Sequence, residues 1–143
     1  MTLVVDASVA VKWLVDEPEH LAARSLLDRG EQLQAPDFVF VETADVLWKK
    51  VLRHELTTQQ AVEGVDWLPR LFEAIIPSTL LVARALRIAI EMAHPVYDCL
   101  YLACSEHVDA DLVTANARFA AKVRAASPGA RAHALSEFGA GPR

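Results

Sequence analysis

Cysteine is scarce in this 143-residue sequence, and its two cysteines, Cys99 and Cys104, lie in one stretch that we expect to be helical. Their spacing places the two side chains more than one turn apart, on different sides of such a helix. Neither a disulfide between them nor a metal ion held by both is therefore expected. We interpret both as small buried hydrophobic residues.

The sequence also lacks the signals that direct a chain into or across a membrane. Its N-terminus has no basic region followed by an apolar stretch and a small-residue cleavage site. No apolar run approaches the roughly 20 residues that a membrane-spanning helix needs. We therefore expect a cytoplasmic protein without a membrane partner.

Glycine and proline are few, at 5 and 7 residues, and no internal repeat is evident, which argues against a disordered or low-complexity chain. Hydrophobic residues make up 53% of the sequence, enough for one domain with a buried core. The formal net charge of −5 disfavours binding to nucleic acid through net charge alone. It does not exclude nucleic acid, because carboxylates that hold cations would themselves lower the formal charge.

Strand and helix patterns alternate along the chain. Runs of apolar and β-branched residues predict strands near 2–6, 32–35, 72–78, 110–115 and 130–135. Capping residues, prolines and glycines bound the predicted helices 7–15, 19–30, 36–54, 57–69, 78–93, 96–107 and 116–126. In particular, Pro36 and Asp37 are expected to open one helix, and Ser78 or Thr79 to cap another. The alternation predicts an α/β domain with a largely parallel sheet and helices on both faces.

Three acidic residues attract attention because ligands of such sheets lie beyond the carboxyl ends of the strands. Asp6 follows the first strand and is either a helix cap or a member of a site. Glu42 is either part of a solvated face with Asp45 and Lys49, or a partly desolvated carboxylate among apolar neighbours. Asp98 stands in the first turn of an apolar helix, where the helix dipole alone would favour it.

Taken together, Asp6, Glu42 and Asp98 fit one arrangement at the strand-end rim of a sheet. Like charges repel by about 4 kcal/mol at 4 Å and an effective dielectric near 20, so a divalent cation would stabilise the cluster. Carboxylates are the ligands that Mg²⁺ and Mn²⁺ prefer. Such a site supports metal-assisted hydrolysis of a phosphodiester bond.

Four separated motifs carry a resemblance to a known family: "VVDASVAVKW", "APDFVFVETADVLWKK", "HPVYDCLYLACSEH" and "LVTANARF". In order and spacing the sequence resembles PIN domains, and most closely the VapC-type toxins of bacterial toxin–antitoxin (VapBC) pairs. The resemblance implies a three-layer α/β/α sandwich over residues 1–135, followed by a short tail, 136–143. It also implies a Mg²⁺- or Mn²⁺-dependent endoribonuclease, an RNA substrate, a small VapB-like antitoxin and frequent homodimers.

Position by position, the resemblance implies that Asp6, Glu42 and Asp98 hold the metal. Ser8 matches a small hydroxyl that contacts metal-bound water or substrate, and Thr114 matches the hydroxyl that ends the fourth strand. Asn116 departs from the pattern, because the family usually has a fourth aspartate there. This change removes one negative charge from the site and leaves the number of metal ions open.

Two other functions are weighed against the nuclease. Asn116 motivates a catalytically weakened domain that only binds RNA or an antitoxin. Phosphoryl transfer through an aspartyl intermediate fits poorly, because Ser8 stands where haloacid-dehalogenase-like enzymes need a second aspartate.

Several cations are candidates to contact phosphates, although we interpret them as solvated helix-face charges: Lys12, Arg24, Lys49, Lys50, Arg53 and Arg118. For His94 and His107, ordinary surface or boundary roles are favoured over binding a hard metal.

Overall fold

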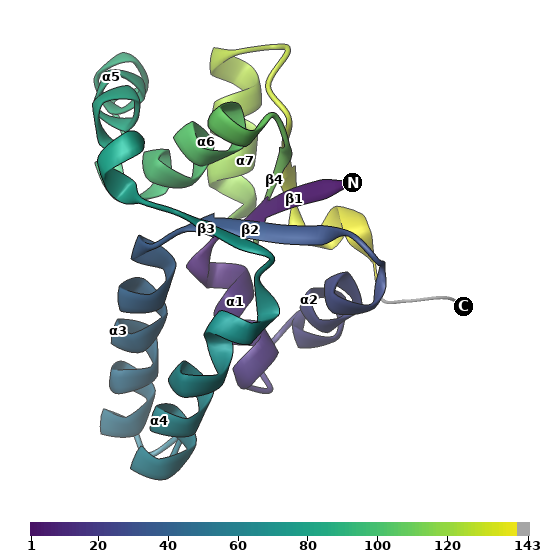
Figure 1. Cartoon of the computed structure of the whole chain (residues 1–143), viewed down its shortest axis with the longest axis vertical. Coiled ribbons are helices and arrows are strands. Elements are labelled where there is room, and N and C mark those ends of the chain that lie inside the picture. Colours follow the sequence, from purple (N-terminus) through teal and green to yellow (C-terminus); the bar gives the residue numbers. More distant parts are fainter. Residues whose placement is uncertain (140–143) are drawn as a thin grey trace.

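A single parallel sheet organises the protein, whose computed structural model describes residues 1–139 (Figure 1). Its five strands stand in the order β3-β2-β1-β4-β5, and every neighbouring pair is parallel. The strands are β1 (Thr2–Val5), β2 (Gln32–Pro36), β3 (Ala74–Ile76), β4 (Asp111–Thr114) and β5 (Ala132–Ala134).

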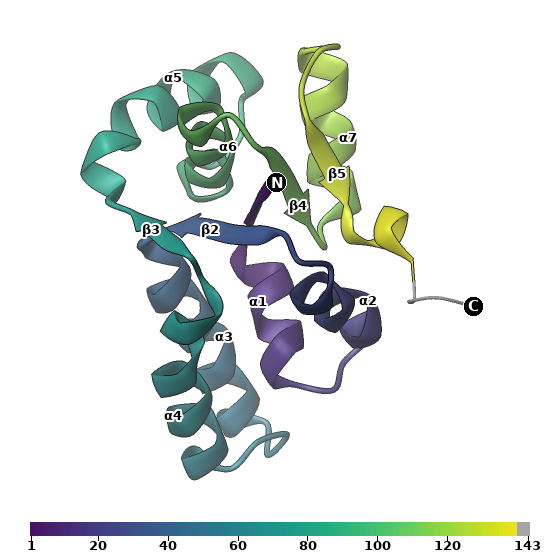
Figure 2. The ribbon, with the colours of Figure 1, turned by 45° about the vertical axis from the view of Figure 1, so that its right-hand side comes forward.

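Helices cover both faces of this sheet, as Figures 1 and 2 show. One face carries α1 (Ala7–Leu14), α2 (His20–Ser25), α3 (Phe38–Leu52) and α4 (Thr58–Trp67). The opposite face carries α5 (Val82–Met92), α6 (Val96–Val108) and α7 (Ala117–Ala126). Short 3₁₀ turns complete the order: η1 (Leu26–Asp28), η2 (Leu68–Leu71), η3 (Ser78–Leu80) and η4 (Leu135–Phe138). The predicted α/β/α sandwich with a parallel sheet is thereby confirmed.

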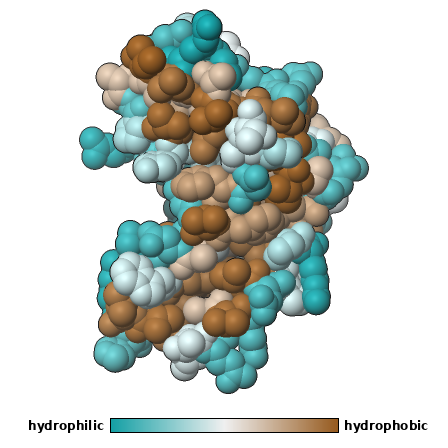
Figure 3. Space-filling model, turned by 60° about the vertical axis from the view of Figure 1, so that its left-hand side comes forward, coloured by the Kyte–Doolittle hydropathy of each residue, from teal (hydrophilic) through white to brown (hydrophobic). Residues whose placement is uncertain are grey.

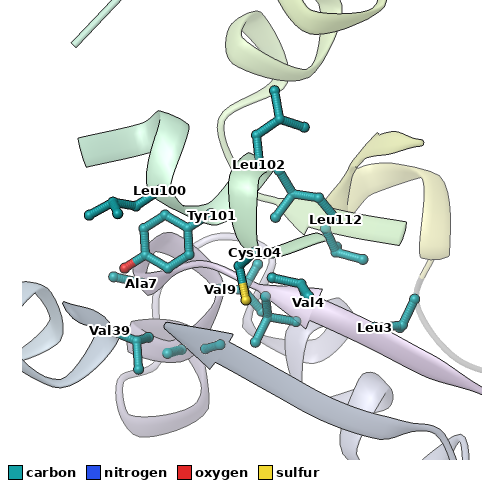
Figure 4. Packing of buried hydrophobic residues seen from close by; sticks show 14 of the residues in the cluster. Leu3, Val4, Ala7, Val9, Val39, Leu100, Tyr101, Leu102, Cys104 and Leu112 are labelled. Atoms are coloured by element: carbon teal, nitrogen blue, oxygen red, sulfur yellow. The ribbon is translucent and has the colours of Figure 1, made fainter. Parts of the chain in front are cut away.

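The core lies between α6, the central strands and the helices of the other face (Figure 4). Val4 and Val5 of β1 are fully buried because this strand is covered on both faces. Cys99 and Cys104 are buried free thiols within the core, as the sequence predicts.

The order of the strands creates a switch point beside β1. The chain runs outward from β1 through β2 to β3, then crosses the other face to β4, which pairs with β1 through Val5 and Val113. Adjacent carboxyl ends whose connections leave in opposite directions form the crevice in which open α/β sheets bind ligands. Asp6 follows β1 directly, and Asn116 stands at the start of α7 just after β4.

Two predicted helix starts are wrong. Pro36 is the last residue of β2 rather than the first of a helix, and α3 begins at Phe38. Ser78 caps no helix: its hydroxyl and amide both donate to the Asp37 carboxylate, while η3 precedes the start of α5 at Val82. In both places an interaction between distant segments decides where the element begins.

The C-terminal part continues past the last strand into η4, whose Phe138 packs against the core. Glu137 in this turn pairs with Arg124 of α7. The remainder of the predicted tail, residues 140–143, lies outside the described residues. Within residues 1–139, no helix is both long and apolar enough to cross a membrane.

Candidate functional site

Asp6 is a helix cap and a buried member of a polar cluster at the same time. It is the N-cap residue of α1, and its Oδ1 accepts a hydrogen bond from the Val9 amide at 3.2 Å. The same oxygen accepts a hydrogen bond from the Ser8 hydroxyl. The two interpretations of Asp6 therefore do not exclude each other.

Burial makes the charge of Asp6 costly. The residue is only 6% exposed, and desolvation raises the pKa of its carboxyl to about 6. Hydrogen bonds from Ser8, Thr114 and Val9 act in the opposite direction, and the charge of Asp98 adds to the rise. The negative charge of Asp6 is therefore unfavourable in the folded protein, and a nearby cation would stabilise it.

Glu42, in the first half of α3, points away from open solvent toward the opposite layer. Its Oε1 accepts a hydrogen bond from the Tyr101 hydroxyl at 2.6 Å, across 59 positions of sequence. Desolvation raises the pKa of Glu42, and the charges of Asp6 and Asp98 raise it further. The exposed ion pair of this helix joins Asp45 and Lys49 instead. Of the two interpretations of Glu42, the structure therefore supports the partly desolvated carboxylate rather than the solvated helix face.

Asp98 occupies the first turn of α6 and is tied to the loop that precedes it. Its Oδ2 lies 2.7 Å from Nε2 of His94. The ammonium of Lys122 lies 3.1 Å from Nδ1 of His94, and because an ammonium only donates, Nδ1 must accept. This pattern places the imidazole proton on Nε2, so a neutral His94 donates to Asp98.

Ser8, Thr114 and Asn116 join the ends of β1 and β4 in one network. The Ser8 hydroxyl lies 3.4 Å from that of Thr114 and accepts a hydrogen bond from the Ala115 amide at 2.9 Å. The Thr114 hydroxyl accepts a hydrogen bond from the Asn116 amide. Asn116 is the N-cap of α7, where its Oδ1 accepts from the Phe119 amide at 3.0 Å.

All six candidate residues lie at this edge of the sheet. Asp6, Ser8, Thr114 and Asn116 share one hydrogen-bond network, whereas Glu42 and Asp98 each bond to a different partner. Tyr101 and His94, which hold Glu42 and Asp98, were not among the candidates. For His94 the spacing of four to Asp98 across a helix start was an available signal. For Tyr101 the signal was weaker: a tyrosine in an apolar helix needs a partner for its hydroxyl. Tyr101 is buried, and Figure 4 shows its hydroxyl end close to Ala7.

The carboxylate oxygens at this edge are of the kind that bind a hard divalent cation. A cation would also offset the negative charge of Asp6 and Glu42, whose pKa values are raised and which stand near a third acid. Within residues 1–139, however, no three His, Cys, Asp or Glu side chains stand close enough together to hold one ion. Magnesium commonly uses one or two protein carboxylates and completes its shell with water. A site based on two of these acids therefore suits the donor set.

Most of the cations considered for phosphate contacts are engaged elsewhere. Lys12 and Lys50 both pair with Glu17, at 3.1 and 2.8 Å. Lys50 is only 8% exposed, so its interpretation as a solvated charge is wrong; Glu17 stabilises it in a buried position. Arg24 and Arg53 pair with nearby carboxylates on the surface. Arg118 is exposed close to Asn116.

Comparisons with known proteins agree with this architecture. A sequence profile described as the PIN domain matches residues 3–125. A curated relative, Ribonuclease VapC3 from Pyrobaculum aerophilum, is 30% identical over 124 residues, which span 85% of this chain and 95% of the relative.

Two crystal structures show the same fold. PAE2754 from Pyrobaculum aerophilum has a TM-score of 0.72 at 20% identity, and the match covers 96% of this chain and 86% of the other. VapBC2 from Rickettsia felis, bound to a DNA fragment from their promoter, has a TM-score of 0.64 at 15% identity. That match covers 94% of this chain and 98% of the other.

Proposed function

The chain belongs to the PIN-domain family, and on this premise we propose that it is a metal-dependent endoribonuclease acting as the toxin of a toxin–antitoxin pair. The observation that carries the proposal is the gathering of Asp6, Glu42 and Asp98 at one sheet edge, where burial and the charge of neighbouring acids raise the pKa values of the first two. The similarity to a VapC ribonuclease supports RNA as the substrate. We propose the cytoplasm as the site of this activity, because cellular RNA is available there.

In this proposal Asp6 and Asp98 would hold Mg²⁺ or its substitute Mn²⁺, and Glu42 would add negative charge nearby rather than a third close ligand. When bound, such a metal would supply positive charge to polarise the phosphate, to lower the pKa of a water molecule and to offset charge on the leaving oxygen. Ser8 and Thr114 keep the Asp6 carboxylate oriented through hydrogen bonds. Thr114 is fully buried, so of the two hydroxyls only that of the partly exposed Ser8 is open to water or substrate. Asn116 contributes an amide rather than a fourth charge.

The proposal is tested by incubating the purified protein with structured RNA and Mg²⁺ or Mn²⁺. We expect cleavage that EDTA abolishes and that Asp98→Asn lowers by at least about 100-fold, because the metal loses a charged ligand. Asp45→Asn, which changes an exposed acid of α3 paired with Lys49, is the matched control and should cleave normally. Cleavage that survives both EDTA and Asp98→Asn would refute the assignment.

The alternative is a domain of the same fold that binds RNA or an antitoxin without cleaving, which Asn116 favours by removing a negative charge. Calorimetric titration with Mn²⁺ separates the two functions. The nuclease predicts binding that Asp6→Asn weakens, whereas a folded protein without detectable Mn²⁺ binding supports the binding domain.

We further propose that the antitoxin covers the groove between α3 and α4. This groove has a volume of about 400 Å³ and is lined mainly by apolar side chains, including Leu47, Trp48, Val62 and Val65. Trp48 and Val62 are more than half exposed. A groove with this apolar lining suits an apolar segment of a partner. The likeness to the fold in a VapBC2 structure supports a partner of this kind.

A homodimer is proposed through α5. Val82, Leu86 and Ile90 recur every four residues on this helix and are 49%, 51% and 72% exposed. Figure 3 shows apolar patches on the upper and lower parts of this side of the molecule. An exposed apolar stripe along one helix suits a second copy of itself, because a two-fold interface needs the same patch on both subunits.

A further inference from the structure

Two cations near the candidate site have no acidic partner, although the protein carries a net charge of −5. Lys12, Lys49 and Lys50 all form ion pairs with carboxylates. Across residues 1–139, Lys122 and Arg118 have no carboxylate within ion-pair distance, and Lys122 is the one lysine of which this is true. In an acidic protein, two neighbouring uncompensated cations indicate a surface that receives negative charge.

Both cations line the same hollow, of about 620 Å³, together with His94, Asn116 and Phe119. We call this space the basic hollow. The hollow lies next to the sheet edge that carries Asp6, Glu42 and Asp98, which we call the acidic edge. His94 forms part of both, because its Nε2 lies 2.7 Å from Asp98. The hollow and the three acids are therefore adjacent but opposite in charge.

Lys122 is held in place by the loop between α5 and α6. Its ammonium donates to the Ala93 carbonyl oxygen at 3.3 Å and to Nδ1 of His94 at 3.1 Å. An ammonium has three N–H groups, so one donor remains for a ligand. The cation is thus positioned in advance, and binding an anion would cost little further ordering of this side chain.

Asn116 suits the same ligand. Its Oδ1 accepts from the Phe119 amide, which leaves the NH₂ group of the side chain as a donor. An aspartate at this position would present only acceptors and a negative charge toward the basic hollow. The departure at Asn116 therefore makes the hollow more favourable for an anion.

We propose that the basic hollow binds an internal backbone phosphate of the RNA, next to the phosphate at which cleavage occurs; this inference rests on the proposed ribonuclease function. RNA carries one negative charge per nucleotide, so phosphates flanking the cleaved bond would be repelled by Asp6, Glu42 and Asp98. Arg118, Lys122 and the Asn116 amide supply the donors that offset this repulsion. The contact positions the strand and reads no sequence.

The first test measures binding of a fluorescent single-stranded RNA in EDTA, so that neither metal nor cleavage contributes. We expect Arg118→Gln and Lys122→Gln each to raise Kd about three- to tenfold and to reduce the slope of log K against log salt by about 0.7. Lys122→Arg should retain most of the affinity. Arg70→Gln, which changes an exposed arginine outside the hollow, is the matched control. Variants of the hollow that bind like Arg70→Gln would overturn the proposal.

The second test identifies the phosphate. RNAs that carry one uncharged methylphosphonate linkage, moved along the strand, should bind wild-type protein more weakly at one internal position. The Arg118→Gln, Lys122→Gln double variant should lose this penalty, because its phosphate partner is already gone. A penalty of equal size in both proteins would overturn the assignment, as would an effect confined to RNAs with a 5′-terminal phosphate.

Asn116→Asp offers an independent check, since it should weaken metal-free RNA binding by adding a negative charge to the hollow. Unchanged binding by this variant would contradict the role given to Asn116. Failure of the nuclease proposal remains distinguishable, because it is read from Mg²⁺-dependent cleavage and its loss in Asp98→Asn, whereas the basic hollow is read from binding in EDTA.

Discussion

Each acid of the candidate site has its own hydrogen-bond donor. Ser8 donates to Asp6, Tyr101 to Glu42 and His94 to Asp98. A buried carboxylate needs such a partner because desolvation otherwise favours its protonated form. For Asp6 the partners do not compensate fully, since the pKa of its carboxyl remains at about 6. The site thus keeps a destabilising charge in the folded protein.

Asp6→Asn should therefore stabilise the metal-free protein at neutral pH. The carboxyl pKa is raised from 3.8 to about 6, so the folded state holds the proton more tightly than the unfolded state. The stability of wild-type protein then falls as pH rises from 4 to 6, whereas the neutral amide of the variant can still cap α1 and does not titrate. The expected gain is close to zero below pH 4 and about 2–3 kcal/mol above pH 6.

Urea unfolding in EDTA at several pH values measures this difference. Excess Mg²⁺ should raise the stability of wild-type protein more than that of Asp6→Asn, because a ligand that binds the folded state stabilises it by mass action and the variant binds the ion more weakly. If the free energies of unfolding of wild-type and Asp6→Asn protein differ by the same amount at every pH from 4 to 8, Asp6 carries no destabilising charge.

At the scale of elements, ends of helices and strands depend on more than local sequence. The predicted start of α4 is present, because Thr57 and Gln60 form a capping box within four residues of sequence. The end of β2 at Pro36 was not predicted, because its pairing with β3 extends the strand through that proline. Ser78 likewise bonds to Asp37 rather than capping α5. Local signals fail where a distant partner competes for the same group.

Glu17 connects three elements, and its removal should destabilise their packing. It follows α1, precedes α2 and pairs with Lys50 of α3 as well as with Lys12. Glu17→Gln should cost about 2–4 kcal/mol, because it leaves the buried Lys50 ammonium without a counter-charge. The lysines lower the pKa of Glu17 against the opposing effect of its burial, so this stabilisation is present at neutral pH and is lost as pH falls through that lowered value.

The matched control is Asp45→Asn, which breaks the exposed pair with Lys49 and should cost less than about 0.5 kcal/mol. Both variants are compared by thermal and urea unfolding at pH 7. Equal losses in the two variants would mean that the burial of Lys50 adds nothing to the pair.

At the scale of the whole molecule, two exposed apolar surfaces lie on separate helices, one on α5 and one between α3 and α4. Large exposed apolar areas on a small protein indicate interaction sites. Separate surfaces would allow a second copy of the chain and an antitoxin to bind at the same time.

The homodimer proposed through the exposed apolar stripe of α5 can be tested by the mass of the protein in solution. Leu86→Glu combined with Ile90→Glu should convert the proposed dimer to a monomer, because buried carboxylates would face each other across the two-fold interface. Light scattering after size-exclusion chromatography measures the mass, with Leu21→Glu on α2, a similarly exposed leucine, as control. A wild-type protein that is monomeric at high concentration would contradict the proposal.

The sequence by itself determined the alternation of strands and helices, the placement of Asp6 and Asp98 at the starts of helices, and the resemblance to PIN domains, because periodicity and caps are local properties. Only the tertiary structure decided which residues meet across the sheet. The contacts of Tyr101 with Glu42 and of Lys122 with His94 join segments that are 59 and 28 positions apart. Such contacts arise from the packing of whole layers, so no local pattern encodes them.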